Sequence, residues 1–77
     1  MNIKLVDVTI HVDDPLDAQR RETAEAALRA KDGMVSVHFP DNRPHLITVE
    51  YNPDKLGSRE ILHTVTNLGL RAELVGL

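Results

Sequence analysis

The chain has 77 residues, no cysteine, no tryptophan and a formal net charge of -3 at pH 7. Its length predicts a single domain spanning residues 1–77, and the lack of thiols excludes disulfides, thiolate metal sites and cysteine nucleophiles. The acidic balance argues against nucleic-acid binding, and no apolar run is long enough to cross a bilayer. Residues 1–5 lack the long apolar core of a signal peptide, so we expect a soluble cytoplasmic protein that contacts no membrane.

The first predicted element is a strand over residues 3–12, in which apolar and polar residues alternate and His11 lies on the polar side. An acidic loop follows it. Here Asp14 is the expected N-cap of a helix and Pro15 its first residue, because each type is favoured at that position. Asp17 is the expected third helical residue, where a capping box usually has Glu or Gln. Helix capping therefore accounts for these acids without a bound ligand.

The spacing of apolar residues and the positions of glycine and proline predict the remaining elements. The expected elements, in chain order, are a helix over residues 15–31, strands over 34–39 and 45–51, a helix over 59–68 after an N-cap at Ser58, and a strand over 71–75. Gly33 and Gly69 are expected to end the two helices. The order is that of an α+β, ferredoxin-like βαββαβ sandwich. We expect an antiparallel sheet of strand order 4-1-3-2, both helices on one face, and an open second face.

The second strand has a further implication. Alternation over residues 34–39 places Val35 and Val37 on the core face and Ser36 and His38 on the open face. The segment has no full charge and has high β-propensity, and the predicted strand order leaves it at an edge of the sheet. We therefore expect it to be the surface through which a homodimer would form.

The chain resembles the heavy-metal-associated domain family in the order and spacing of five segments: residues 24–28, 32–37, 47–54, 61–62 and 67–70. The resemblance covers nearly the whole chain and implies the same ferredoxin-like fold. Known members of the family are small copper or mercury carriers and the N-terminal domains of metal-pumping ATPases. They hold a soft cation with the two cysteines of a Cys-x-x-Cys loop.

The positions that would make this chemistry are all changed. By the resemblance, the two cysteines fall on Asp17 and Arg20, the Gly-Met before them on Asp14-Pro15, and a late aromatic on Leu70. Because Cu(I) selects thiolates and thioethers, no metal ligand is carried over from the family. The implied function is a protein-docking or accessory module linked to metal handling, whose protein partner the sequence does not name.

Histidines and acids near one end of the sheet leave a second function open, the binding of Zn²⁺, Ni²⁺ or Cu²⁺ through nitrogen and oxygen ligands. The candidate ligands are His11, His38, Asp13, Asp14 and Asp17. The predicted strand order puts the third strand between His11 and His38, which separates their backbones by about 9–10 Å. Ordinary solvated histidines are the alternative interpretation.

Enzyme function is not expected. The chain has neither a Ser/His/Asp order nor a phosphate-binding glycine loop, so we assign no catalytic residue. We expect no cofactor for the same reason.

Overall fold

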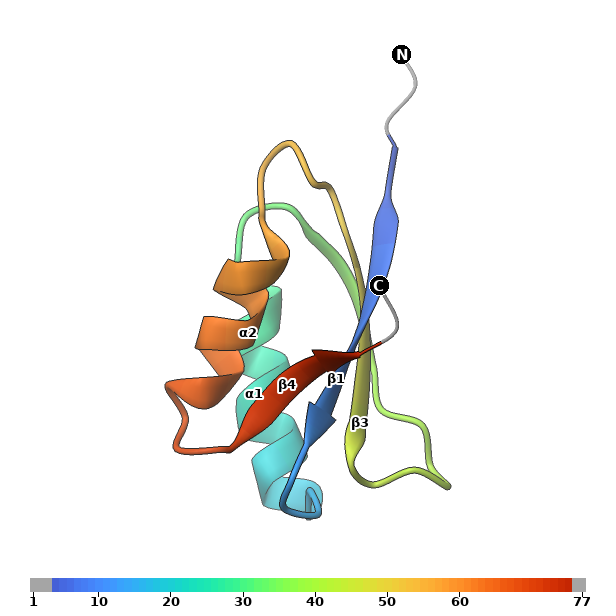
Figure 1. Cartoon of the computed structure of the whole chain (residues 1–77), viewed down its shortest axis with the longest axis vertical. Helices are drawn as coiled ribbons and strands as arrows, with labels where there is room; N and C mark the ends of the chain where they lie inside the picture. The colour runs from blue at the N-terminus through green and yellow to red at the C-terminus, as the bar shows by residue number, and fades with distance from the viewer. Residues whose placement is uncertain (1–3, 76–77) are drawn as a thin grey trace.

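Six elements follow one another in the computed structural model, which describes residues 4–75 (Figure 1). They are β1 (Val6–Val12), α1 (Ala18–Arg29), β2 (Met34–His38), β3 (Leu46–Tyr51), α2 (Ser58–Thr66) and β4 (Ala72–Val75). The start of the expected first strand, residue 3, lies outside the described residues. Within the described chain, neither helix is long and apolar enough to cross a lipid bilayer.

The strands form one sheet of order β2-β3-β1-β4, and every neighbouring pair is antiparallel. This is the expected order 4-1-3-2 counted from the other edge, so the predicted topology is confirmed. Both helices cover the same face of the sheet, and within residues 4–75 no helix or strand covers the opposite face (Figure 1). The central strand β1 sets Ile10 opposite Ile47 of β3 and Leu74 of β4.

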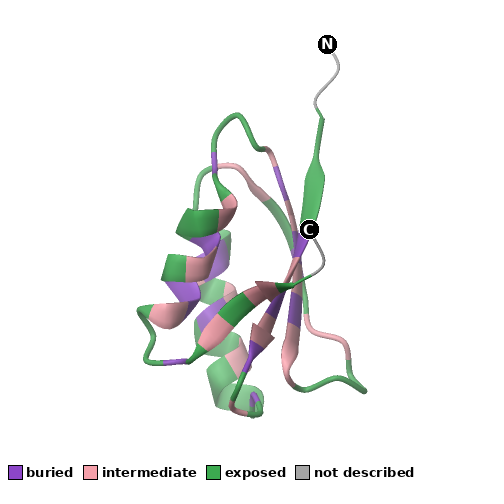
Figure 2. Ribbon diagram, in the orientation of Figure 1, coloured by how far each residue is buried: buried purple, intermediate pink, exposed green. Residues whose placement is uncertain are grey.

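The core lies between the helices and the sheet, where buried residues of the two layers face one another (Figure 2). On β1, alternate residues Val8, Ile10 and Val12 are at most 1% exposed, as the alternating pattern predicts. Leu28 of α1 and Ile61 of α2 complete the other side and are fully buried. Each large aliphatic side chain buried in this way contributes about 1.5–3 kcal/mol to stability.

The start of α1 differs from the expectation. The helix begins at Ala18, and its N-cap is Asp17 in an extended conformation, with φ -76° and ψ 175°. The expected N-cap at Asp14, first helical residue at Pro15 and third helical residue at Asp17 are therefore wrong. The reason is Leu16, which is only 4% exposed and belongs to the core cluster, while its N–H donates to a carbonyl in the loop before β3 at 3.1 Å. Because the Leu16 side chain is buried in the core, the helix begins about one turn later than expected, at Ala18.

The second helix also starts one residue earlier than expected. Gly57 is the N-cap of α2, without a side-chain hydrogen bond, and Ser58 is the first helical residue. Gly33 and Gly69 have φ values of +99° and +86°, so both do occupy conformations that favour glycine. Each lies beyond the C-cap of the preceding helix, in the turn that leads to the next strand.

A β-bulge changes the faces of β2. Met34 and Ser36 are paired with consecutive residues of β3, so Val35 is an extra residue in the strand. Val35 is 50% exposed, whereas Met34 packs against the core together with Val37. The expectation that Val35 shares the core face with Val37 is wrong, because the bulge interrupts the alternation. The position of β2 at a sheet edge is confirmed.

Candidate functional site

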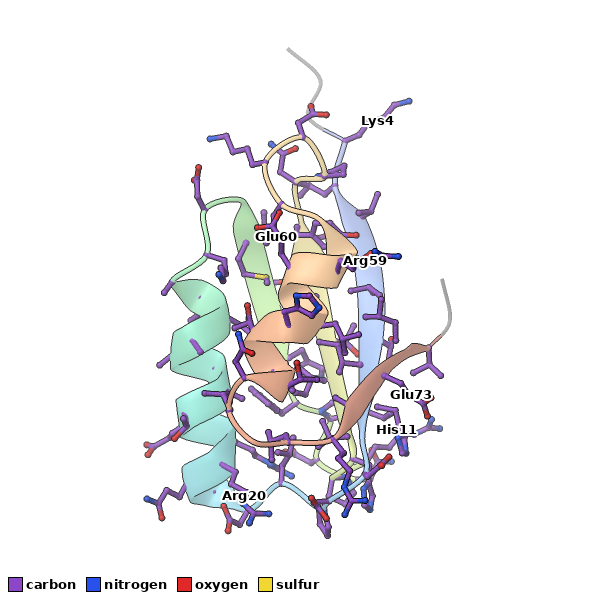
Figure 3. All side chains as sticks on the ribbon, turned by 60° about the vertical axis from the view of Figure 1, so that its left-hand side comes forward. Lys4, His11, Arg20, Arg59, Glu60 and Glu73 are labelled. Carbon is purple, nitrogen blue, oxygen red and sulfur yellow. The ribbon has the colours of Figure 1, made fainter. Side chains whose placement is uncertain are left out.

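Three side chains able to bind a metal meet near the C-terminal end of β1. His11 lies directly opposite Glu73 in the β1–β4 pair, and Asp13 follows β1 immediately. The His11 Nδ1 atom lies 3.7 Å from Asp13 Oδ1 and 4.0 Å from Glu73 Oε1. Figure 3 shows His11 and Glu73 projecting side by side from their two strands. The backbone N–H of Asp13 donates to the Arg71 carbonyl at 2.8 Å, which holds the end of β1 against β4.

The His11 ring is only partly open to solvent. Its side chain is 39% exposed, but the Nδ1 atom itself is buried and has no hydrogen-bond partner within residues 4–75. Both carboxylate contacts of this atom are longer than a hydrogen bond. The carboxylates are themselves more open, with Asp13 53% and Glu73 70% exposed. The buried His11 Nδ1 atom therefore faces two exposed carboxylates without a hydrogen bond to either.

His45 supports the His11 ring. The two rings stack with centroids 5.7 Å apart and planes 10° from parallel. His45 Nδ1 lies 2.9 Å from the Val12 carbonyl, and because a carbonyl only accepts, this nitrogen carries the proton in that hydrogen bond. The contact holds His45 against the end of β1, so the neighbouring His11 ring has a packed partner on one side.

The other candidate ligands lie elsewhere. His38 is exposed on β2 and pairs with Thr48 of β3, so β3 separates it from His11 as the predicted order requires. Asp14 is half-buried, and Asp17 caps α1; neither belongs to the group that His11, Asp13 and Glu73 form.

Glu73 was not among the predicted ligands. Its place on the open face follows from alternation along the last strand, and the predicted strand order sets that strand beside the first. Its position directly opposite His11 depends on the β1–β4 register, for which the sequence gives no direct signal.

A second group of residues lies at the start of α1. The Asp17 Oδ1 atom accepts a hydrogen bond from the backbone N–H of Arg20 at 2.8 Å, which satisfies one of the free donors of the first turn. The Arg20 side chain is exposed at the lower end of the molecule in Figure 3. A shallow hollow beside it reaches the turn between α2 and β4, where Leu68 is 37% exposed and Leu70 is buried. We call this surface, made by Asp17, Arg20 and Leu68, the corner.

Several solved structures share this architecture. The N-terminal domain of a potential copper-translocating P-type ATPase from Bacillus subtilis superposes with a TM-score of 0.84 at 20% identity, over 95% of this chain and 90% of that one. Oxidized MerP from Ralstonia metallidurans CH34 gives a TM-score of 0.83 at 14% identity, over 95% and 100% of the two chains. The yeast copper transporter domain Ccc2a gives 0.80 at 17% identity, over 91% and 94%. This chain has the fold of the heavy-metal-associated domains. No protein-family model and no curated protein sequence matches it significantly.

The chain has this fold but no cysteine, so it cannot form the Cys-x-x-Cys loop that the resemblance implies for the family. The sequence resemblance assigns the two cysteine positions to Asp17 and Arg20, which the structure places at the N-cap and in the first turn of α1. A carboxylate that caps a helix and a guanidinium that has no acceptor atom do not suit Cu(I), which prefers thiolate and thioether ligands. The corner therefore does not fit the cargo of a thiolate carrier.

Proposed function

We propose that the chain is an accessory module of metal handling, which docks onto another domain of heavy-metal-associated fold and does not itself carry Cu(I). One observation carries the proposal. The carboxylate of Asp17 is used to cap α1, and Arg20 beside it presents a cation where the resemblance puts the second cysteine. By the resemblance, the chain would thus combine the carrier fold with a fixed positive charge at one of the two ligand positions.

The choice of partner rests on the fold. The similar solved structures include a CopZ metallochaperone and an ATPase N-terminal domain, which are two kinds of protein sharing one architecture. We infer that the partner is a domain of the same fold, which would bind through an anionic surface to the positive charge of Arg20 at the corner. A guanidinium stays protonated at any physiological pH, so Arg20 would supply that charge permanently.

The surface around Arg20 suits a weak protein contact. The side chain of Leu68 is 37% exposed and lies on the other side of the hollow, so it adds apolar area beside the two charged groups. Protein interfaces that form and dissociate combine such an apolar centre with charges at the rim, and the charges affect the rate of association most strongly. The competing explanation is an ordinary helix surface whose charges contribute about 0–1 kcal/mol to stability and nothing to binding.

A titration monitored by nuclear magnetic resonance distinguishes docking through the corner from an ordinary helix surface. The ¹⁵N-labelled chain is titrated in turn with each metal-free heavy-metal-associated domain encoded by the same genome. We expect at least one domain to shift amide signals of residues 17–23 and 68–70, which surround the corner. Arg20→Glu reverses the charge and should weaken that binding by about tenfold, a loss of about 1.4 kcal/mol.

Arg59→Glu is the matched control, because Arg59 is also exposed on a helix but lies in the first turn of α2, well away from Arg20 (Figure 3). This control should bind like the wild-type chain. The proposal fails if no domain shifts the corner signals, or if both charge reversals weaken binding equally.

A further inference from the structure

We propose that His11, Asp13 and Glu73 form a binding site for a borderline divalent cation, with Zn²⁺ as the reference ion. Each residue offers one ligand atom, and the three atoms all lie within 4.8 Å of one another. The site uses neither Asp17 nor Arg20, so it is independent of docking through the corner. It would add a metal-binding activity based on nitrogen and oxygen to a fold whose family uses sulfur.

The separations between these atoms are close to those around a bound ion. Zn²⁺ lies about 2.0–2.2 Å from nitrogen and oxygen ligands, so two ligand atoms of a tetrahedral site are roughly 3.4 Å apart. The observed distances from His11 Nδ1 are 3.7 Å to Asp13 and 4.0 Å to Glu73. Both carboxylates are more than half exposed, and small rotations of their side chains would close the remaining few tenths of an ångström to His11. The two carboxylate oxygens, which lie within 4.8 Å of each other, would be drawn together by the ion.

The chemistry of the three groups selects the ion. An imidazole with two carboxylates suits Zn²⁺, Ni²⁺ and Cu²⁺, whereas Mg²⁺ and Ca²⁺ prefer oxygen alone and Cu(I) prefers sulfur. A neutral His11 and two ionised carboxylates carry two negative charges, which match a divalent ion. The buried Nδ1 atom has no partner within the described residues, and a metal bond would satisfy it.

The backbone and a neighbouring ring hold the ligands in place. His11 lies inside the β1 ladder, paired on both sides, and its ring stacks on His45. The hydrogen bond from Asp13 to Arg71 fixes the residue that follows the strand. Supporting contacts of this kind orient metal ligands and raise affinity. Three protein ligands leave a fourth position for water or for a donor from another molecule.

An ordinary surface histidine beside two carboxylates that together bind no ion is the competing arrangement, and it predicts no response to metal. The chelator-treated chain is therefore titrated with Zn²⁺, and separately with Ni²⁺, by calorimetry and by thermal unfolding. We expect binding of one ion per chain and a rise in melting temperature of about 10–20 °C at a hundredfold excess over Kd. On addition of Zn²⁺, the ring nitrogen signals of His11 should move and those of His38 should not.

Substitutions identify the ligands. His11→Gln and Glu73→Gln should each weaken Zn²⁺ binding at least tenfold, with folding checked by circular dichroism. The matched controls are His38→Gln and Glu50→Gln, which make the same changes on β2 and β3 and should leave the affinity unchanged. Absence of binding, or binding that survives both His11→Gln and Glu73→Gln, overturns the site. Either result leaves the docking proposal intact, because docking depends on Arg20.

Discussion

Replacing Asp17 and Arg20 together by cysteine should turn the corner into a soft-metal site. The Asp17 side chain already reaches the backbone N–H of Arg20 at 2.8 Å, so side chains at these two positions lie within reach of each other. Two thiolates are enough to hold a soft cation such as Cu(I) or Hg²⁺. The N-terminus of a helix also lowers the pKa of a thiol, which favours the thiolate form in both new side chains.

The expected effects on stability have opposite signs. Loss of the Asp17 cap should cost about 1 kcal/mol, which lowers the melting temperature of the metal-free variant by about 4–8 °C. Cu(I) at a hundredfold excess over Kd should then add about 2.7 kcal/mol to the free energy of unfolding. On the same scale the loaded variant should melt about 10–20 °C above its metal-free form. The wild-type chain should show no such rise.

Thermal unfolding under anaerobic conditions measures both effects. The control replaces Asp17 and Arg20 together by serine, which keeps side chains of similar size and a hydroxyl able to cap α1 but supplies no thiolate. If the cysteine variant folds and Cu(I) stabilises it no more than the serine variant, these positions do not match the metal loop of the family. The proposal of docking through the corner then loses its main support.

Two further predictions concern the scaffold. Gly33→Ala should lower the free energy of unfolding in urea by about 1–3 kcal/mol, because φ is +99° there and the new Cβ would lie 2.8 Å from the Cβ of Lys55. Gly69→Ala meets no atom within 4 Å at φ +86° and should cost less; equal losses would refute the steric part of this explanation. The β2 edge is the expected contact of a homodimer, so Ser36→Lys should lower the association constant measured by sedimentation while the monomer stays folded. A dimer that withstands this change uses another surface.

The sequence predicts the fold because its signals are local and mutually consistent. Alternation along β1 and the apolar stripe of α2 identify the buried faces, and the order of elements leaves few topologies to consider. The errors arise where tertiary packing overrides a local preference. Pro15 suits the first turn of a helix, but burial of Leu16 keeps the loop extended, and the cap moves to Asp17.

The candidate metal group is only partly visible in the sequence. His11 and Asp13 are two residues apart and can be paired by inspection. Glu73 joins them through the β1–β4 register, which depends on how the whole sheet assembles. The bulge at Val35 is hidden for a similar reason, because an extra residue shows only when two strands are paired.

Competition for Cu(I) tests most directly whether this chain keeps the carrier fold without the carrier chemistry. The purified chain is mixed anaerobically with the Cu(I) complex of a strong chromogenic chelator, and the absorbance of the complex is followed. We expect no transfer, because the chain has no cysteine and the thioether of Met34 packs against the core. Transfer of one equivalent of Cu(I) to the chain would contradict this account.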